Sequence, residues 1–354
     1  MTHCKLATSS LSVYAGVKSY SLKGKLLTRK DLQMLSESRD LDELITRIKG
    51  TSYADAISKV TKPYTSAKIE LALRDRQADM HYKMIQAAGG SNVLFAYYLR
   101  FVLQNLKIIL KGKILGRDQA EIESSVNLHS TELIKERDVI VKAMIARDIE
   151  EAVTTLKGIG IGDEVEKAFS IYREKNQIQI IDLYFDKFFY ENLSHVVKTS
   201  TDFNLHTVCG TEIDHYNMLC VLRGKFWNLD ENQIQDLIIP GTSGPSKEIL
   251  TRMISSDSIK SALNELTGTK YRELVPQEEN SIDAISQFER AFEMHIYRMM
   301  QSQFSKIFGF STIVAIIKLI EYEVRNLAAI AFAVEQKIPS ETTMSRLIVK
   351  EGSD

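Results

Sequence analysis

The chain has 354 residues, of which 44% are hydrophobic and 26% charged, with a formal net charge of −1 at pH 7. These proportions are typical of a folded globular protein, and the charge balance removes any whole-chain argument for nucleic-acid binding. Three cysteines provide no disulfide framework and suit a reducing compartment, while only five prolines and 17 glycines favour long helices over many short strands.

The N-terminal segment, up to Lys30, carries basic side chains and no acidic ones. No apolar core of signal-peptide length follows, so we interpret this segment as a solvated basic helix or a partner contact. No uninterrupted apolar run approaches the roughly 20 residues that span a bilayer. The best candidate, residues 313–320, is broken by Lys318, and we expect no transmembrane segment. The basic residues are Lys5, Lys18, Lys23, Lys25, Arg29 and Lys30.

An apolar helical stripe that ends in glycine occurs three times, at residues 40–50, 148–158 and 258–268. The closing glycines are therefore almost evenly spaced along the chain. In each copy the apolar residues fall at i, i+3, i+4 and i+7, which predicts an amphipathic helix, and the glycine suits a helix stop. A nearly constant period indicates tandem repeats.

A second landmark keeps the same period. Residues 105–113, with the sequence Asn-Leu-Lys-Ile-Ile-Leu-Lys-Gly-Lys, match residues 217–225 and 326–334, and an asparagine leads each copy. Between the two landmarks each period has an aromatic-rich helix, for example residues 174–193. A shorter helix, such as residues 231–239, closes the unit. Tyrosines are in register in the three aromatic helices, at Tyr82, Tyr190 and Tyr297.

These parts predict an all-α fold of three tandem helical-bundle domains, each of about 110 residues, which is enough to bury its own core. We place the domains at residues 1–128, 129–240 and 241–354. The Pro- and Gly-rich loop at residues 240–245 marks the second boundary, whereas the first rests mainly on the period.

The segment Gly158-Ile159-Gly160-Ile161-Gly162 resembles a phosphate-binding glycine loop. The dinucleotide fingerprint requires a preceding strand, a following helix and an acidic residue about 20 positions later. Here a helix precedes the loop, and the repeat already explains Gly158 as a helix end. We therefore predict no cofactor site.

A cluster of His206, Cys209, His215 and Cys220 has residue types that bind zinc. Cys220, however, lies within the repeated apolar helix, and His215 and Cys220 are five residues apart, which does not place both on one helical face. We favour a core role for Cys220 and predict no metal site.

The acids Asp182, Asp186 and Glu191 lie within an aromatic helix and could act as general acid–base groups. We favour a charged helix face opposite a packed one. No nucleophile elbow, Walker loop or zinc-protease helix is present in the sequence, so we predict no catalytic residue.

Two basic pairs flank glycines near the ends of asparagine helices, Lys111 with Lys113 and Arg223 with Lys225. They could bind an anion, but cations in the last turn of a helix also interact favourably with its dipole. The third copy has Phe-Ala-Val at residues 332–334 instead, so we expect its helix to continue rather than stop.

The repeated asparagine block, together with residues 21–32 and 321–327, resembles the C subunit of archaeal A-type ATP synthases and its vacuolar-type relative, the d subunit. The resemblance covers essentially the whole chain. It implies a funnel of three helical domains around a pseudo-threefold axis. It also implies a non-catalytic central-stalk (rotor) subunit without a cofactor, which couples the membrane proteolipid ring to the central axle so that ion flow drives ATP synthesis or the reverse.

The resemblance further implies a peripheral position on the cytoplasmic side of the cell membrane. The implied partners are the proteolipid ring, the central axle subunits and other ATP synthase subunits, with no nucleic acid. We hypothesise partner contacts at Lys111, Lys113, Arg223 and Lys225. The compact length favours the A-type member over the vacuolar one. The alternatives are a stand-alone α-helical adaptor that binds cytosolic partners and an enzyme based on the glycine loop or the His/Cys cluster.

Overall fold

A computed structural model of the chain describes residues 2–240, 244–277, 281–305 and 309–350, with side chains from Val13 onward. All regular structure in these ranges is helical, which confirms the all-α prediction. Residues 241–243 of the predicted boundary loop, and the side chains of Cys4 and Lys5, lie outside the described residues.

The chain forms two compact units, which are not the predicted sequence repeats. Unit 1 contains residues 1–101, 125–137 and 297–354, and unit 2 contains residues 102–124 and 138–296. The unit boundaries fall inside helices α6 (Asn92–Ile114) and α17 (Ser281–Ser302). The three domains at 1–128, 129–240 and 241–354 stay a prediction about the repeats.

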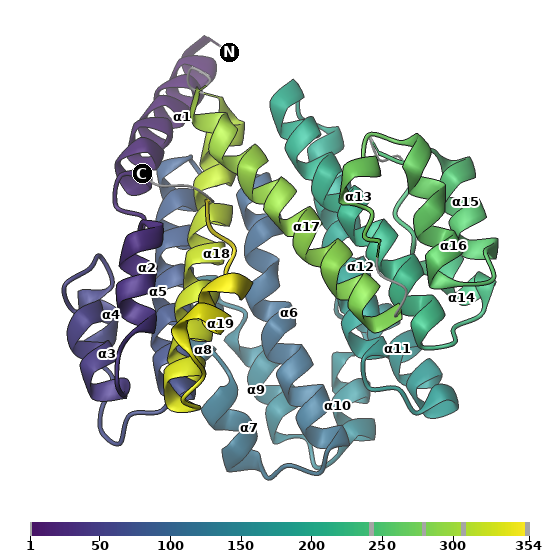
Figure 1. The fold of residues 1–354 in the computed structure, drawn as a ribbon, viewed down its shortest axis with the longest axis horizontal. Coiled ribbons are helices and arrows are strands. Elements are labelled where there is room, and N and C mark those ends of the chain that lie inside the picture. The colour runs from purple at the N-terminus through teal and green to yellow at the C-terminus, as the bar shows by residue number, and fades with distance from the viewer. Residues whose placement is uncertain (1, 241–243, 278–280, 306–308, 351–354) are drawn as a thin grey trace. The chain divides into compact units, whose positions relative to one another are not determined.

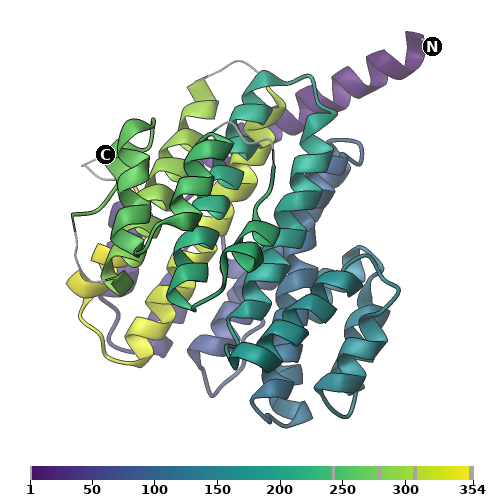
Figure 2. The same cartoon turned by 90° about the vertical axis from the view of Figure 1, so that its right-hand side faces the viewer.

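Most helices of unit 1 come from the two ends of the chain, and α8 comes from residues 125–137 (Figure 1). They are α1 (Thr2–Lys23), α2 (Arg29–Ser36), α3 (Leu41–Ile48), α4 (Ala54–Ile57), α5 (Ser66–Ala87), α8 (Leu128–Leu133), the 3₁₀ turn η3 (Gln303–Ser305), α18 (Phe310–Glu335) and α19 (Ser340–Arg346). The first half of α1 extends away from the other helices of this unit (Figure 2).

Unit 2 contains the middle of the chain. Its helices are α7 (Gln119–Ser125), α9 (Arg137–Ile145), α10 (Ile149–Leu156), α11 (Gly162–Lys175), α12 (Ile180–Lys198), α13 (Phe203–Phe226), α14 (Glu231–Leu237), α15 (Lys247–Ser255), α16 (Ile259–Asn264) and the 3₁₀ turns η1 (Glu265–Gly268) and η2 (Arg272–Leu274). The first residue of α9 and the last of α7 belong to unit 1.

The three predicted stripe helices are α3, α10 and α16, and all three begin with the same cap. The side chains of Asp40, Asp148 and Ser258 each accept a hydrogen bond from the backbone N–H three residues later. Such a cap satisfies one of the free N–H groups at a helix start and stabilises the helix by about 1 kcal/mol. The predicted stripes are buried for the most part, so the periodicity identified these helices correctly.

The glycines that close these stripes act differently from one another. Gly158 has a φ of 84°, the left-handed conformation that a glycine helix stop requires. Gly50 and Gly268 have no positive φ, and Gly268 instead ends the 3₁₀ turn η1. The predicted glycine stop is therefore correct in the second copy only.

The asparagine helices α6, α13 and α18 all end nine residues after their landmark asparagine, at Ile114, Phe226 and Glu335. Two residues further on, Gly116, Asn228 and Lys337 each adopt a left-handed conformation, with φ of 67°, 54° and 58°. In each copy the next residue returns a hydrogen bond to the carbonyl five residues before it, as in a Schellman turn.

The expectation that the third helix continues where the other two stop is therefore wrong. The stop depends on the turn that follows the helix rather than on the Gly-Lys pair within it. Lys337 occupies the left-handed position in the third copy, and lysine gives no sequence signal for that conformation.

The aromatic helices are α5, α12 and α17, and the tyrosines in register contact tyrosines of the asparagine helices. Ring centroids are 6.4 Å apart for Tyr82 and Tyr98, 4.6 Å for Tyr190 and Tyr216, and 5.8 Å for Tyr297 and Tyr322. The predicted helix over residues 174–193 begins later, at Ile180, because Asn176 adopts a left-handed conformation that ends α11.

The landmark asparagines hold the segment that follows the short closing helix. The Asn217 side chain donates to the carbonyl of Ile239 and accepts from its N–H, at 3.0 and 2.9 Å. Asn326 makes the same pair of bonds to Ile348, at 2.8 and 3.0 Å. In both cases the isoleucine follows the asparagine by 22 residues. A buried amide therefore holds the chain after the short closing helix against the long helix in two copies.

Within unit 1, α18 packs along α5 and also contacts α1, α2 and α3 (Figure 1). The third asparagine helix therefore lies against helices of the first repeat, which are distant from it in sequence. This helix is nearly covered, and its buried residues include the run from Ser311 to Ile320.

One helix in the described residues, α6, is long and apolar enough to cross a membrane by length and composition. It was not the candidate at residues 313–320 that the sequence indicated. Most of its apolar window, 61%, is buried inside the protein, as in the core helix of a folded domain.

The glycine between the two basic residues permits a close approach of the following short helix. A Cβ at Gly112 would lie 2.7 Å from Ile122 Cγ1, and a Cβ at Gly224 would lie 2.7 Å from Ile234 Cγ1. At the corresponding positions of the third copy the chain has Ala333 and Thr343. The third copy thus has alanine instead of glycine on the long helix and the smaller threonine instead of isoleucine on the short helix.

Two buried carboxylates of the asparagine helices accept hydrogen bonds from tyrosines of a neighbouring repeat. In unit 1, Tyr53 Oη donates to Glu323 at 2.7 Å, and the Leu27 N–H donates to the same carboxylate. In unit 2, Tyr271 Oη donates to Asp214 at 2.6 Å. Each carboxylate precedes its landmark asparagine by three residues, and each tyrosine follows its stripe glycine by three.

The remaining copy replaces this polar pair with apolar residues. The equivalent positions are Val102 and Ile161, and both side chains are buried. A carboxylate without its tyrosine would leave a buried charge, so the joint absence of acid and hydroxyl is physically consistent. Burial raises the pKa of Glu323 to about 7, although the bonds from Tyr53 and Leu27 act in the opposite direction.

We predict that Gly224→Ala destabilises the protein by about 1–3 kcal/mol, because the added methyl group overlaps Ile234. The double variant G224A/I234T reproduces the pair found in the third copy. It should be more stable than the sum of the two single changes predicts. Denaturant unfolding of the four proteins tests this coupling, and strictly additive free energies would contradict it.

We also predict that Glu323→Gln stabilises the protein at pH 8 and not at pH 4.5. The pKa of Glu323 is raised on folding, so wild-type stability is lost as pH rises from 4.5 through about 7. The amide can accept from Leu27 and donate to Tyr53, and since each pKa unit corresponds to about 1.4 kcal/mol, the gain is at most about 3 kcal/mol. Glu123→Gln, at an exposed residue, is the control. An equal gain at both pH values would rule out this role for Glu323.

Candidate functional site

Two of the four predicted contact residues form ion pairs in unit 2. Lys111 on α6 lies 3.0 Å from Asp182 on α12, and Arg223 on α13 lies 2.8 Å from Glu289 on α17. Both cations follow their landmark asparagine by six residues, and both acids precede the registered tyrosine by eight. The same interaction therefore joins two successive asparagine helices to the aromatic helix of the next repeat.

In the third copy, the equivalent positions are occupied by Phe332 and Arg74. Phe332 is 53% exposed, and Arg74 pairs with Glu70 on its own helix. The third copy therefore lacks the pair, as its missing basic residues indicate.

The ion pairs are only partly covered. The Lys111 and Arg223 side chains keep 33% and 30% of their surface exposed. Burial alone would lower the pKa of Arg223, but the adjacent Glu289 carboxylate raises it above its usual value. Each pair thus carries polar groups that remain accessible from solvent.

The other two predicted contact residues, Lys113 and Lys225, cap helices of the next repeat. The Lys113 ammonium donates to the carbonyls of Met144, at 3.1 Å, and Ala146, at the end of α9. The Lys225 ammonium donates to the carbonyls of Ile254 and Ser256, at the end of α15. Cations at a helix C-terminus satisfy free carbonyls and complement the dipole.

Partial burial lowers the pKa of both Lys113 and Lys225. In the third copy, Lys337 performs a related task in unit 1, since its ammonium donates to the carbonyl of Arg39, which follows α2, at 3.0 Å. All four predicted contact residues therefore have intramolecular roles. Their contact with a partner stays a prediction.

The glycine loop at residues 158–162 connects two helices. Gly162 is the first residue of α11, and its N–H donates to the carbonyl of Ile159 at 2.8 Å. A Cβ at Gly162 would lie 2.8 Å from the Leu156 carbonyl oxygen, so glycine serves a tight turn between α10 and α11. No strand precedes the loop in the described chain, and the dinucleotide fold is not formed.

The predicted His/Cys cluster consists of separately packed side chains along α13. His206 Nε2 lies 2.7 Å from the Ser200 carbonyl oxygen, and the His215 ring stacks on Phe292 with centroids 4.5 Å apart. Cys209 and Cys220 are buried, and burial raises the pKa of the Cys220 thiol to about 12. Among the residues with described side chains, no group of three His, Cys, Asp or Glu is placed to hold a metal ion.

The acids of the aromatic helix lie beside cations of α6 rather than facing solvent alone. Asp186 is 2.6 Å from Lys107, and Asp182 pairs with Lys111, while Glu191 is exposed. Sequence reasoning missed this pairing. The matching registers of basic residue, acid and tyrosine were available as a signal.

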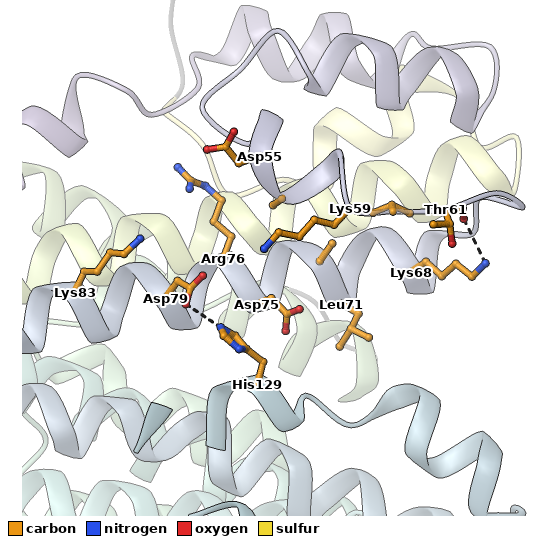
Figure 3. Close-up of a pocket in the computed structure, with 13 residues that line it drawn as sticks. Asp55, Lys59, Thr61, Lys68, Leu71, Asp75, Arg76, Asp79, Lys83 and His129 are labelled. Carbon is orange, nitrogen blue, oxygen red and sulfur yellow. Dashed lines mark hydrogen bonds and ion pairs between the residues drawn. The ribbon is translucent and has the colours of Figure 1, made fainter. Parts of the chain in front are cut away.

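Sequence reasoning also missed a cavity of about 520 Å³ in unit 1, formed between α4, α5 and His129 of α8 (Figure 3). Its charged residues along α5 are Lys68, Asp75, Arg76, Asp79 and Lys83. The spacing of residues 68, 72, 76, 79 and 83 places them on one helical face, and this periodicity was the available signal.

Comparisons with known proteins agree over most of the chain. The C subunit of the A-type ATP synthase from Methanothermobacter thermautotrophicus is 27% identical over 321 residues, covering 87% of this chain and 80% of that protein. The corresponding proteins of Pyrococcus furiosus and Methanocaldococcus jannaschii are 25% and 24% identical, covering 93% and 95% of this chain and 88% and 86% of theirs.

A model of the ATP synthase (C/AC39) subunit family matches residues 17–346. This match includes both landmarks of all three repeats, with their capped stripe helices and asparagine helices. The chain therefore belongs to the ATP synthase (C/AC39) subunit family.

Proposed function

We propose that this subunit of an A/V-type ATP synthase is a non-catalytic part of the central stalk. In this role it couples the membrane proteolipid ring to the central axle, so that ion flow drives ATP synthesis or the reverse. The protein is peripheral, on the cytoplasmic side of the membrane, and its membrane association comes from partners. Family membership supports the assembly, and the curated relatives are named as A-type subunits.

The observation that carries the proposal is the repeated connection between neighbouring repeats. In unit 2, α6 pairs with α12 through Lys111, and α13 pairs with α17 through Arg223. In unit 1, α18 packs on α5. The order of contacts is therefore first repeat to second, second to third and third to first, which supports the inferred threefold arrangement.

Such a scaffold suits a part that transmits torque. A socket between a ring of many identical subunits and a single axle cannot match both symmetries, so its adhesion must come from several modest patches. Ion pairs and helix caps that link successive repeats resist shear within the protein. Residues of the metal and glycine-loop alternatives also have packing or hydrogen-bonding roles, as His206 and Gly162 illustrate.

We predict that the chain co-purifies from detergent-solubilised membranes with a proteolipid ring and nucleotide-binding subunits. Affinity purification of the tagged chain, followed by mass spectrometry, provides the measurement. Recovery only in a soluble complex without the ring would favour the adaptor alternative. Nucleotide turnover by the isolated chain would contradict the non-catalytic role.

Partner contact through the exposed part of Lys111 can be separated from its internal role by a charge swap. Lys111→Asp breaks the pair with Asp182, whereas K111D/D182K restores it with both signs exchanged. If Lys111 contacts a partner, both variants should lower the amount of ring recovered. If its role is only internal, the double variant should recover assembly while the single variant does not, and the partner contact would be abandoned.

A further inference from the structure

We propose that the cavity in unit 1 binds a small phosphate-bearing anion through Lys59, Arg76 and Lys83. This proposal does not depend on the coupling role, because every residue of the proposed site comes from this chain and binding can be measured without partners. Its walls come from α4 and the loop after it, from one face of α5, and from His129. At about 520 Å³ the space accommodates a phosphate or pyrophosphate with its water.

The lining charges are not equally available to a ligand. Lys68 is occupied, because its ammonium donates to the carbonyls of Thr61 and Pro63 at 3.4 and 2.9 Å. Asp79 is occupied as well, since His129 Nε2 lies 2.8 Å from its carboxylate. These hydrogen bonds hold both side chains in place, so we assign ligand binding to the other cations.

Arg76 is the strongest hydrogen-bond donor group among the residues that line the cavity. Its Nε is buried and has no hydrogen-bond partner among the described residues. Its guanidinium lies over the Tyr53 ring, at 5.3 Å from the centroid, which orients the planar group. A guanidinium is always charged and donates only, and a buried donor without a partner costs about 1–3 kcal/mol. Nε itself is covered by protein, so an oxyanion in the cavity would bind the outer nitrogens of the guanidinium.

Two ammonium groups accompany this guanidinium. Figure 3 shows the ends of the Lys59, Arg76 and Lys83 side chains directed toward one region of the cavity. None of the three has an ion pair within 4 Å in the described chain, although Lys59 acts on the pKa of Asp75 and Arg76 on that of Glu323. An arginine fork with two lysine point charges is a combination that suits phosphate oxygens.

Two further acids limit the positive charge of the cavity without cancelling it. Asp55 is exposed, and Asp75 is directed away from the three cationic ends in Figure 3. Burial raises the pKa of Asp75, while His129 and Lys59 act in the opposite direction. Four Lys and Arg side chains and three Asp side chains thus line the cavity, an excess of one positive charge.

The lining also indicates which phosphate compounds fit. No Phe, Tyr or Trp lines the cavity in the described part of the chain, and the His129 ring is held by Asp79 at 2.8 Å, which disfavours stacking on a nucleotide base. Recognition would depend on the phosphate group itself. Inorganic phosphate and pyrophosphate are therefore the best probes, with ADP as a test for a nucleotide source.

Isothermal titration of the full-length chain with pyrophosphate, phosphate and ADP at constant ionic strength tests the proposal. We expect pyrophosphate to bind, and K59M/K83M to weaken its binding by at least about tenfold, because charge-assisted hydrogen bonds are lost. Both lysines are exposed, so these changes leave the core intact. Lys62→Met, at a lysine that pairs with Asp42 outside the cavity, is the matched control and should bind normally.

Arg76→Gln should abolish binding, and circular dichroism will verify that this variant folds. Equal binding of pyrophosphate and ADP would identify phosphate from a nucleotide as a source, whereas binding of pyrophosphate alone would identify free phosphate. The proposal would be overturned by no measurable binding at millimolar pyrophosphate, or by an equal loss in K62M and K59M/K83M.

Discussion

The fold depends on the way each long asparagine helix packs against the repeat that follows it. These helices are the most deeply buried elements, and their polar residues are consequently the ones that must find partners. The partners come from the next repeat in the order of contacts: an acid for Lys111 and Arg223, carbonyl groups for Lys113 and Lys225, and a tyrosine for Asp214 and Glu323. A single geometry thus accounts for the partners of these six side chains.

This constraint also explains where the three copies differ. The pair of acid and tyrosine is lost on both sides together, at Val102 and Ile161, since a buried group without its partner would be costly. The basic residue is replaced by Phe332 where the facing helix has Arg74 instead of an acid. The symmetry of the three repeats is therefore approximate, because in each of these two contacts one copy differs at both partners.

Much of the fold could be predicted from the sequence, because its signals are local. Periodic apolar residues and caps such as Asp148 identify the stripe helices, and the nearly constant period orders them. What could not be predicted depends on contacts distant in sequence. The left-handed Lys337 has no local signal, and neither do the carbonyls of the next repeat that receive Lys113. The cavity around Arg76 escaped notice because mixed charges on one helix face usually indicate a solvated surface.

Native-state hydrogen exchange measured by mass spectrometry tests the central claim most directly. If α18 and α5 stabilise each other, amides of the two helices should open together, with the same free energy and the same denaturant dependence, although they are distant in sequence. Exchange of α5 through an earlier opening that leaves α18 fully protected would contradict the account, because the third repeat would then not be held by the first.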